Sequence, residues 1–141
     1  NQLQDEFHRK EDQLSKTLRG PKKAQIDQNE AELDQLESTL DQLSFEVEEI
    51  EVQIAAIEES MQPYDIRMTA IQAQYPNLVL PANSFREYER LLVDWTGLND
   101  QRNGLITRLN VLVEQHNRTI QEHNRLTEQT NQLFEELAWL P

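Results

Sequence analysis

The sequence predicts an all-α fold, a long antiparallel coiled-coil hairpin with a short N-terminal helix. Two apolar stripes with alternating spacings of three and four residues run through most of the chain, and only residues 76–83 separate them. The chain has just 3 glycines among 141 residues, fewer than the turns of a compact globule require. Its charged and amide residues recur periodically, which is typical of long helices and not of disorder.

The first arm is predicted over residues 21–75. Its apolar positions form a coiled-coil stripe, called the first seam, in which only Asn29 is polar. The first seam comprises Ile26, Asn29, Leu33, Leu36, Leu40, Leu43, Val47, Ile50, Ile54, Ile57, Met61, Tyr64, Met68, Ile71 and Tyr75. Pro63 interrupts the helix chemically without shifting this phase, so we expect a kink in one continuing arm.

The second arm is predicted over residues 84–139. Ser84 and Glu87 have the spacing of a capping box, in which each side chain bonds a free backbone N–H at the helix start. The second seam comprises Tyr88, Leu91, Trp95, Leu98, Arg102, Leu105, Leu109, Leu112, His116, Thr119, His123, Leu126, Thr130, Leu133 and Leu137. Its alternating spacing matches that of the first seam and suits either a two-stranded coil or a bundle.

The lengths of the two arms predict a hairpin. Each arm would be roughly 80 Å long at 1.5 Å per residue, and a connection as short as 76–83 makes antiparallel neighbours. A shorter helix over residues 1–19 is predicted to end at Gly20 and Pro21. If residue numbers across the hairpin sum to about 160, Arg102 is expected near Glu58 and Glu59, and Asn29 near Thr130. The same pairing places His116 near Ser44, His123 near Glu37, and Pro63 opposite Gly97.

The charge distribution narrows the choice of partners. The net charge is −13, and residues 24–66 carry 13 of the 26 acidic residues with no Lys or Arg. Such a surface repels phosphate, so nucleic acid and anionic membranes are disfavoured as direct partners. A basic protein partner, or a strongly solvated surface, fits the charge better. No apolar run approaches the roughly 18 residues that cross a bilayer. The first residues are neither an initiator nor a signal peptide, so we expect a piece of a larger protein.

Catalytic patterns do not occur in the sequence. The chain has no cysteine, no glycine-rich phosphate loop and no segment that reads as a strand. Neighbouring carboxylates such as Glu48 and Glu49 point in different directions on a helix, so they read as a solvated acidic face. We therefore expect no enzyme and no cofactor.

Four polar residues occupy seam positions and are candidate polar core layers: Asn29, Arg102, His116 and His123. A polar residue in a seam specifies register at some cost in stability, and this is the favoured interpretation. The alternatives are a metal site at the two histidines, or a pH- or ligand-responsive sensor whose polar layers change the packing of the coil.

Two further columns run along the second arm. Apolar residues widen the seam on one side, at Ile106, Val113, Ile120 and Phe134, and asparagines recur every seventh residue beside it, at Asn103, Asn110, Asn117, Asn124 and Asn131. A narrow two-helix hairpin covers the apolar edge poorly. The edge therefore predicts self-association, with two hairpins packed side by side as a four-helix dimer. The asparagine column is either part of that contact or a solvated flank.

Residues 110–133 resemble the Asn-x-Leu-Val-x-x-Tyr-Asn heptads in coiled-coil regions of some bacterial exported proteins. His116, His123 and Thr130 stand where that pattern prefers Tyr. Some of these proteins also carry metalloprotease domains, but this chain has no His-Glu-x-x-His motif, so no protease chemistry is carried over. The resemblance implies a bacterial envelope or exterior location.

The connection is the best candidate for a binding site. Leu78, Val79 and Leu80 lie between two prolines, off both seams, and either plug the end of the hairpin or stand exposed to a partner. The candidate partner-binding residues are Tyr75, Leu78, Val79, Leu80, Phe85 and Tyr88. We conclude from the sequence that the chain is a structural or protein-interaction module: a rigid stalk, spacer or assembly domain.

Overall fold

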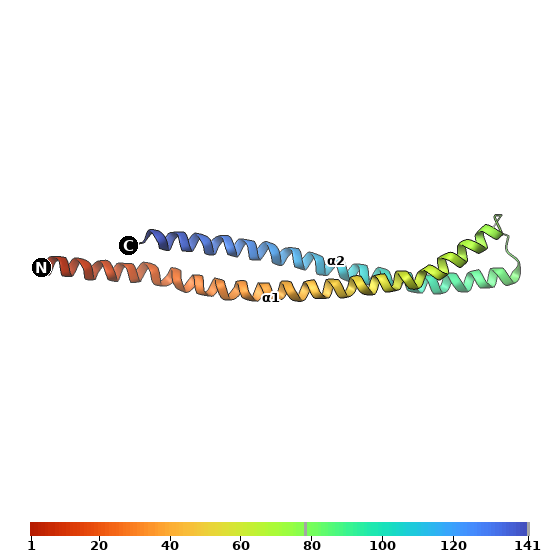
Figure 1. Cartoon of the computed structure of the whole chain (residues 1–141), viewed down its shortest axis with the longest axis horizontal. Helices are drawn as coiled ribbons and strands as arrows, with labels where there is room; N and C mark the ends of the chain where they lie inside the picture. Colours follow the sequence, from red (N-terminus) through yellow and green to blue (C-terminus); the bar gives the residue numbers. More distant parts are fainter. Residues whose placement is uncertain (78, 141) are drawn as a thin grey trace. The chain divides into compact units, whose positions relative to one another are not determined.

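The computed structural model describes residues 1–77 and 79–140, and almost all of these residues are helical. Helix α1 (Gln2–Gln74) has 73 residues and helix α2 (Ala82–Trp139) has 58, with a short connection between them (Figure 1). The described residues form no strand. The two helices pack against each other, so the predicted all-α class and the helical hairpin are confirmed.

Helix α1 does not end at Gly20 and Pro21, so the prediction of a separate N-terminal helix is wrong. A proline inside a helix removes one backbone hydrogen bond and costs about 3 kcal/mol. Contacts on both sides of Pro21 offset this cost. The Arg19 guanidinium donates to the Leu140 carbonyl oxygen over 2.7 Å, and the Lys22 ammonium pairs with the Glu136 carboxylate. Tertiary packing therefore overrides a local stop signal.

Helix α2 begins two residues before the expected start, and the predicted capping box does not form. The Phe85 N–H donates to the Pro81 carbonyl over 2.8 Å, so Pro81 caps the helix and Ser84 already lies within its first turn. The Glu87 carboxylate accepts hydrogen bonds from the Arg67 guanidinium of α1 instead. The Glu87 carboxylate therefore pairs with a guanidinium of the other helix, and not with the backbone N–H at the start of α2 that the capping box predicted.

Pro63 leaves α1 continuous, as the unchanged phase of the first seam predicts. In Figure 1, the yellow-green turns near the end of α1 run in a different direction from the turns before them. A bend at a proline has a known cause, because the ring displaces the preceding turn and one hydrogen bond is missing.

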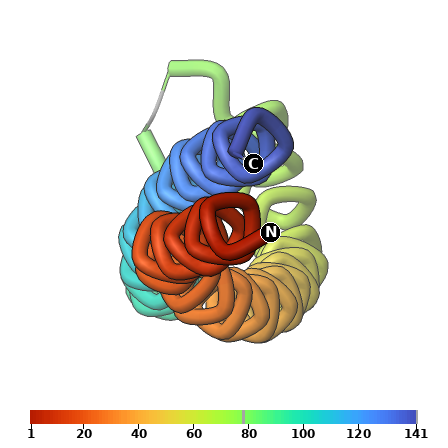
Figure 2. Tube along the Cα trace, turned by 90° about the vertical axis from the view of Figure 1, so that its left-hand side faces the viewer, coloured from red at the N-terminus to blue at the C-terminus, as the bar shows by residue number. Residues whose placement is uncertain are grey.

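The chain divides into two compact units, of which unit 1 comprises residues 1–42 and 115–141. Ile26 of α1 and Leu126 of α2 form its buried apolar core, together with the buried polar pair Asn29 and Thr130. Figure 2 views this unit from its end, with α1 in red and α2 in blue, and Figure 1 shows that the first turns of α1 extend past the end of α2. Residues 1–14 are exposed along their whole length.

Unit 2 comprises residues 43–114 and includes the connection between the helices. Its buried apolar residues are Leu43, Ile54, Met61, Met68 and Ile71 of α1 and Leu112 of α2. The Arg102 and Glu58 side chains pair across the two helices, with Nε and Oε1 3.3 Å apart. Closer to the connection, the Gln72 amide donates to the Tyr88 hydroxyl over 2.8 Å.

Burial follows the two predicted seams. Every position of both seams is buried or half-buried, and between residues 27 and 74 the only other residue with this degree of burial is Glu46. The spacing of apolar residues therefore predicted which face of each helix is covered. Of the neighbours expected across the hairpin, contacts are present between Arg102 and Glu58, Asn29 and Thr130, and His123 and Glu37.

Candidate functional site

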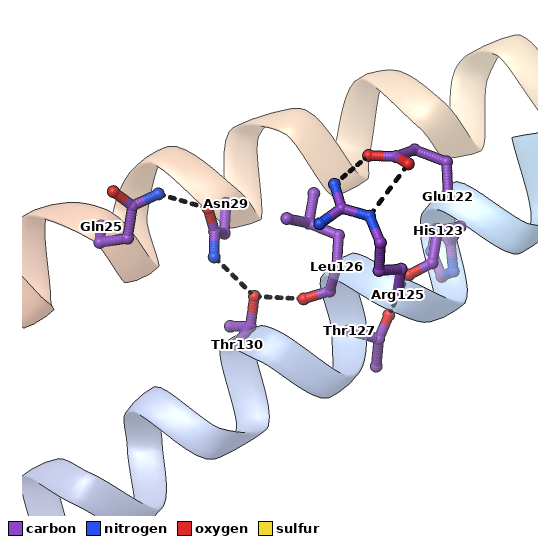
Figure 3. A network of polar contacts seen from close by, with 8 residues as sticks. All are labelled: Gln25, Asn29, Glu122, His123, Arg125, Leu126, Thr127 and Thr130. Atoms are coloured by element: carbon purple, nitrogen blue, oxygen red, sulfur yellow. Dashed lines mark hydrogen bonds and ion pairs between the residues drawn. The ribbon is translucent and has the colours of Figure 1, made fainter.

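The most deeply buried polar group lies in unit 1 (Figure 3). The Asn29 amide donates to the Thr130 hydroxyl over 3.2 Å, and the Gln25 amide donates to the Asn29 side-chain oxygen over 2.8 Å. The Thr130 hydroxyl donates to the Leu126 carbonyl over 2.7 Å. Each polar side chain in the layer thus has a partner, which offsets the cost of removing it from water.

This polar layer fixes how the two helices align. Sliding either helix by one turn would set the Asn29 amide against an apolar side chain and leave its hydrogen bonds unmade, at about 1 to 3 kcal/mol. A single polar residue in a seam is known to select register in this way while lowering stability. The layer is therefore a specificity device and not a ligand site.

Replacing Asn29 with leucine is expected to raise the free energy of unfolding by about 1 to 2 kcal/mol, because an apolar side chain buries well there. The alignment of the helices should then become heterogeneous. Because the chain has no cysteine, spin labels at Gln28→Cys and Gln129→Cys report the distance directly. One narrow distance distribution is expected for the parent chain and a broad or split one for Asn29→Leu.

Asn124 supplies the matched control, since it is an exposed asparagine on α2 in the same unit. Asn124→Leu should leave the distance distribution narrow. A narrow distribution for Asn29→Leu combined with lower stability would mean that the buried amide holds the fold together instead of selecting its register.

The two seam histidines have different surroundings. His123 Nε2 lies 3.2 Å from Glu37 Oε1, as the hairpin predicts, and both groups remain partly exposed. His116 is half-buried and has interactions of its own. Across residues 1–77 and 79–140, no three His, Asp or Glu side chains are arranged to hold a metal ion.

The strongest ionic contact near the connection joins Arg67 of α1 to Glu87 of α2. Hydrogen bonding from the guanidinium holds the pKa of the Glu87 carboxyl below its ordinary value, and the same contact raises the pKa of Arg67. Both shifts favour the charged forms that the two groups already have at neutral pH. The pair fastens the start of α2 to the last turns of α1 beside the candidate binding tip.

The tip residues divide into two sets. Tyr75, Leu80 and Tyr88 are half-buried, so they pack against the hairpin end. Val79 is 79% exposed and Phe85 is 55% exposed, so both present apolar surface to water. Leu78 lies outside the described residues. Of the candidate residues, Val79 and Phe85 are therefore accessible, whereas Tyr75, Leu80 and Tyr88 are accessible only in part.

The apolar edge of α2 is only partly covered. In unit 2, Ile106 is half-buried and Val113 is exposed, and in unit 1, Ile120 is half-buried and Phe134 is exposed.

Trp95 of the second seam was not among the predicted site residues. The buried Trp95 indole N–H is without a hydrogen-bond partner among the described residues, which the sequence could not reveal because the indole sits at an ordinary seam position.

These features define a class of protein by its fold: an all-helical hairpin whose exposed apolar and charged groups lie along its two helices. No protein family matches the chain, and neither a curated protein nor a solved structure is significantly similar to it. Within the described residues, neither helix has an apolar stretch long enough to cross a membrane.

Proposed function

We propose that the chain is a structural and protein-interaction module, an antiparallel coiled-coil hairpin that serves as a stalk, spacer or assembly domain of a larger protein. The observation that carries this proposal is the distribution of burial. Each helix buries one seam, and most of its other described side chains are exposed, so long accessible surfaces run along both helices.

The order of the contacts supports the antiparallel arrangement. Within unit 1, each later residue of α1 contacts an earlier residue in the second half of the chain. The same order holds within unit 2. The contacts are Arg19 with Leu140, Lys22 with Glu136, Asn29 with Thr130 and Glu37 with His123 in unit 1, and Glu58 with Arg102 and Gln72 with Tyr88 in unit 2.

The contact surfaces of the module are the tip and the apolar edge of α2. Val79 and Phe85 give the tip an apolar surface next to a fixed ion pair. The edge offers Val113 and Phe134, and burial of each such side chain is worth about 1.5 to 3 kcal/mol. We assign the edge to self-association and the tip to a protein partner.

The self-association is tested by sedimentation velocity on the whole chain. We expect a dimer at micromolar concentration. Val113→Glu should weaken the dimer at least tenfold, because a carboxylate would replace the buried methyl groups in both copies.

Val111 supplies a closely matched control, because it is 41% exposed and Val113 is 40% exposed, while their side chains lie on opposite flanks of α2. Val111→Glu should leave the dimer unchanged. A monomer across the micromolar range, or equal effects of the two substitutions, would contradict self-association through this edge.

A further inference from the structure

The outer face of α1 in unit 2 carries an apolar column that the hairpin does not use. Between residues 27 and 74, the only large apolar side chains off the first seam are Phe45, Val52 and Ile66. They are 61%, 68% and 70% exposed. All three lie on one column, because Val52 follows Phe45 by seven residues and Ile66 follows Val52 by fourteen.

The position of this column excludes a role in the fold. Each heptad of a coiled-coil helix has two seam residues, three positions apart. The residue two positions after the second of them points away from the partner helix, and Phe45 follows Leu43 in this way. The same holds for Val52 after Ile50 and Ile66 after Tyr64. Isolated exposed apolar residues are common, but three confined to the line opposite the seam form a second periodic stripe.

The period of the stripe indicates the shape of its occupant. Spacings in multiples of seven keep a column in line along a supercoiled helix, so a second helix can follow it over the roughly 10 Å from Phe45 to Val52. Glu59 takes the next position of the column, and Ile66 lies beyond Pro63. Phe45 and Val52 also border a shallow groove, lined in addition by Glu48, Glu49 and Gln53. A helix laid into such a groove buries its apolar anchors there.

The charge beside the stripe indicates the chemistry of the occupant. Glu48 and Glu49 lie one turn from both Phe45 and Val52, and among the described residues neither carboxylate has an ionic or hydrogen-bonding partner. They belong to the stretch 24–66, which has 13 acidic residues and no Lys or Arg. A second copy of this face would be repelled, whereas a helix with Lys or Arg beside its own apolar stripe would be attracted.

We propose that the column of Phe45, Val52 and Ile66 is a docking stripe for a basic amphipathic helix of another protein, which lies along α1 opposite the seam. Its apolar residues cover Phe45 and Val52, and its Lys or Arg side chains pair with Glu48 and Glu49. This surface is separate from the tip and from the apolar edge of α2, and it does not depend on either.

A designed peptide tests the stripe on the whole chain. The probe is a fluorescent helical peptide of three heptads, with Leu at the two seam positions and Lys on the flanks; the comparison peptide has Glu in place of Lys. Fluorescence anisotropy should show binding of the Lys peptide and none of the Glu peptide. Phe45→Gln combined with Val52→Gln should weaken binding at least tenfold.

Exposed valines on α2 in the same unit supply the matched control. Val93 and Val111 are 65% and 41% exposed, so Val93→Gln combined with Val111→Gln removes two exposed apolar side chains elsewhere and should change the affinity less than twofold. Glu48→Gln combined with Glu49→Gln should weaken binding and reduce its dependence on salt. Circular dichroism should show unchanged helix content, because all the substituted side chains are exposed.

Three results would overturn the proposal. The first is absence of binding by the Lys peptide, and the second is equal loss of affinity in the α1 and α2 variants, which would mean non-specific attraction. The third is a loss of self-association in the Phe45→Gln and Val52→Gln variant, which would assign the stripe to a second copy of this chain. Val113→Glu separates the two proposals, because it should alter self-association and leave peptide binding unchanged.

Discussion

Leu112→Ala is expected to lower the free energy of unfolding by about 2 to 5 kcal/mol, which is a large part of the stability of a domain of this size. Leu112 is 2% exposed, and it is the single fully apolar α2 residue in the buried core of unit 2 among the described residues. Truncation leaves a cavity on the packed face, which can close only if the backbone moves. Urea unfolding followed by circular dichroism measures the loss.

Val111→Ala is the matched control, since it removes an exposed side chain from the neighbouring position. Its effect should stay within about 0.5 kcal/mol, because little apolar area is lost and alanine favours the helix. Comparable losses for the two variants would mean that the face bearing Leu112 is not the packed face of α2 in solution.

Pro63→Ala is expected to raise the free energy of unfolding by about 2 kcal/mol. Alanine restores the missing backbone hydrogen bond inside α1 and removes the clash of the proline ring, worth about 3 kcal/mol, while a more flexible unfolded chain returns part of that gain. Pro63 is exposed, so the substitution disturbs no packed side chain. Urea unfolding again provides the measurement.

Pro76 lies outside both helices and supplies the comparison. Pro76→Ala should lower stability by up to about 1 kcal/mol, because no helical hydrogen bond is regained and the unfolded chain gains freedom. Lower stability of the Pro63→Ala chain would instead mean that the bend at Pro63 is needed to bring Met61 and Met68 against α2.

The two seams could be predicted because side-chain spacing determines which face of a helix is covered, and nothing else in the chain competes with that signal. Local signals at the helix ends were less reliable. Gly20 and Pro21 indicated a stop, but the contacts of Arg19 and Lys22 with α2 carry α1 through it. Ser84 and Glu87 indicated a cap, but Glu87 pairs with Arg67 instead. Both errors have one cause, since a contact with the other helix is invisible to a local pattern.

The candidate surfaces could be predicted only in part. The sequence singled out the tip but could not divide it into the half-buried Tyr75 and the exposed Val79, because that division depends on how the chain reverses after α1. Phe45 and Val52 of the outer stripe are seven residues apart, a spacing that the sequence contains. The stripe was not predicted because each arm was expected to have a single apolar face. The exposure of these side chains in the structure shows that the second stripe is uncovered.

The polar pair of Asn29 and Thr130 also bears on how the chain folds. It joins residues 101 positions apart, whereas the contact between Gln72 and Tyr88 spans only 16. Closing the longer loop costs about 1.6 kcal/mol more conformational entropy, so contacts near the connection should form first and the helices should zip toward the chain ends. On this route the buried amide is reached late, when a misaligned pair of helices can still separate and try again.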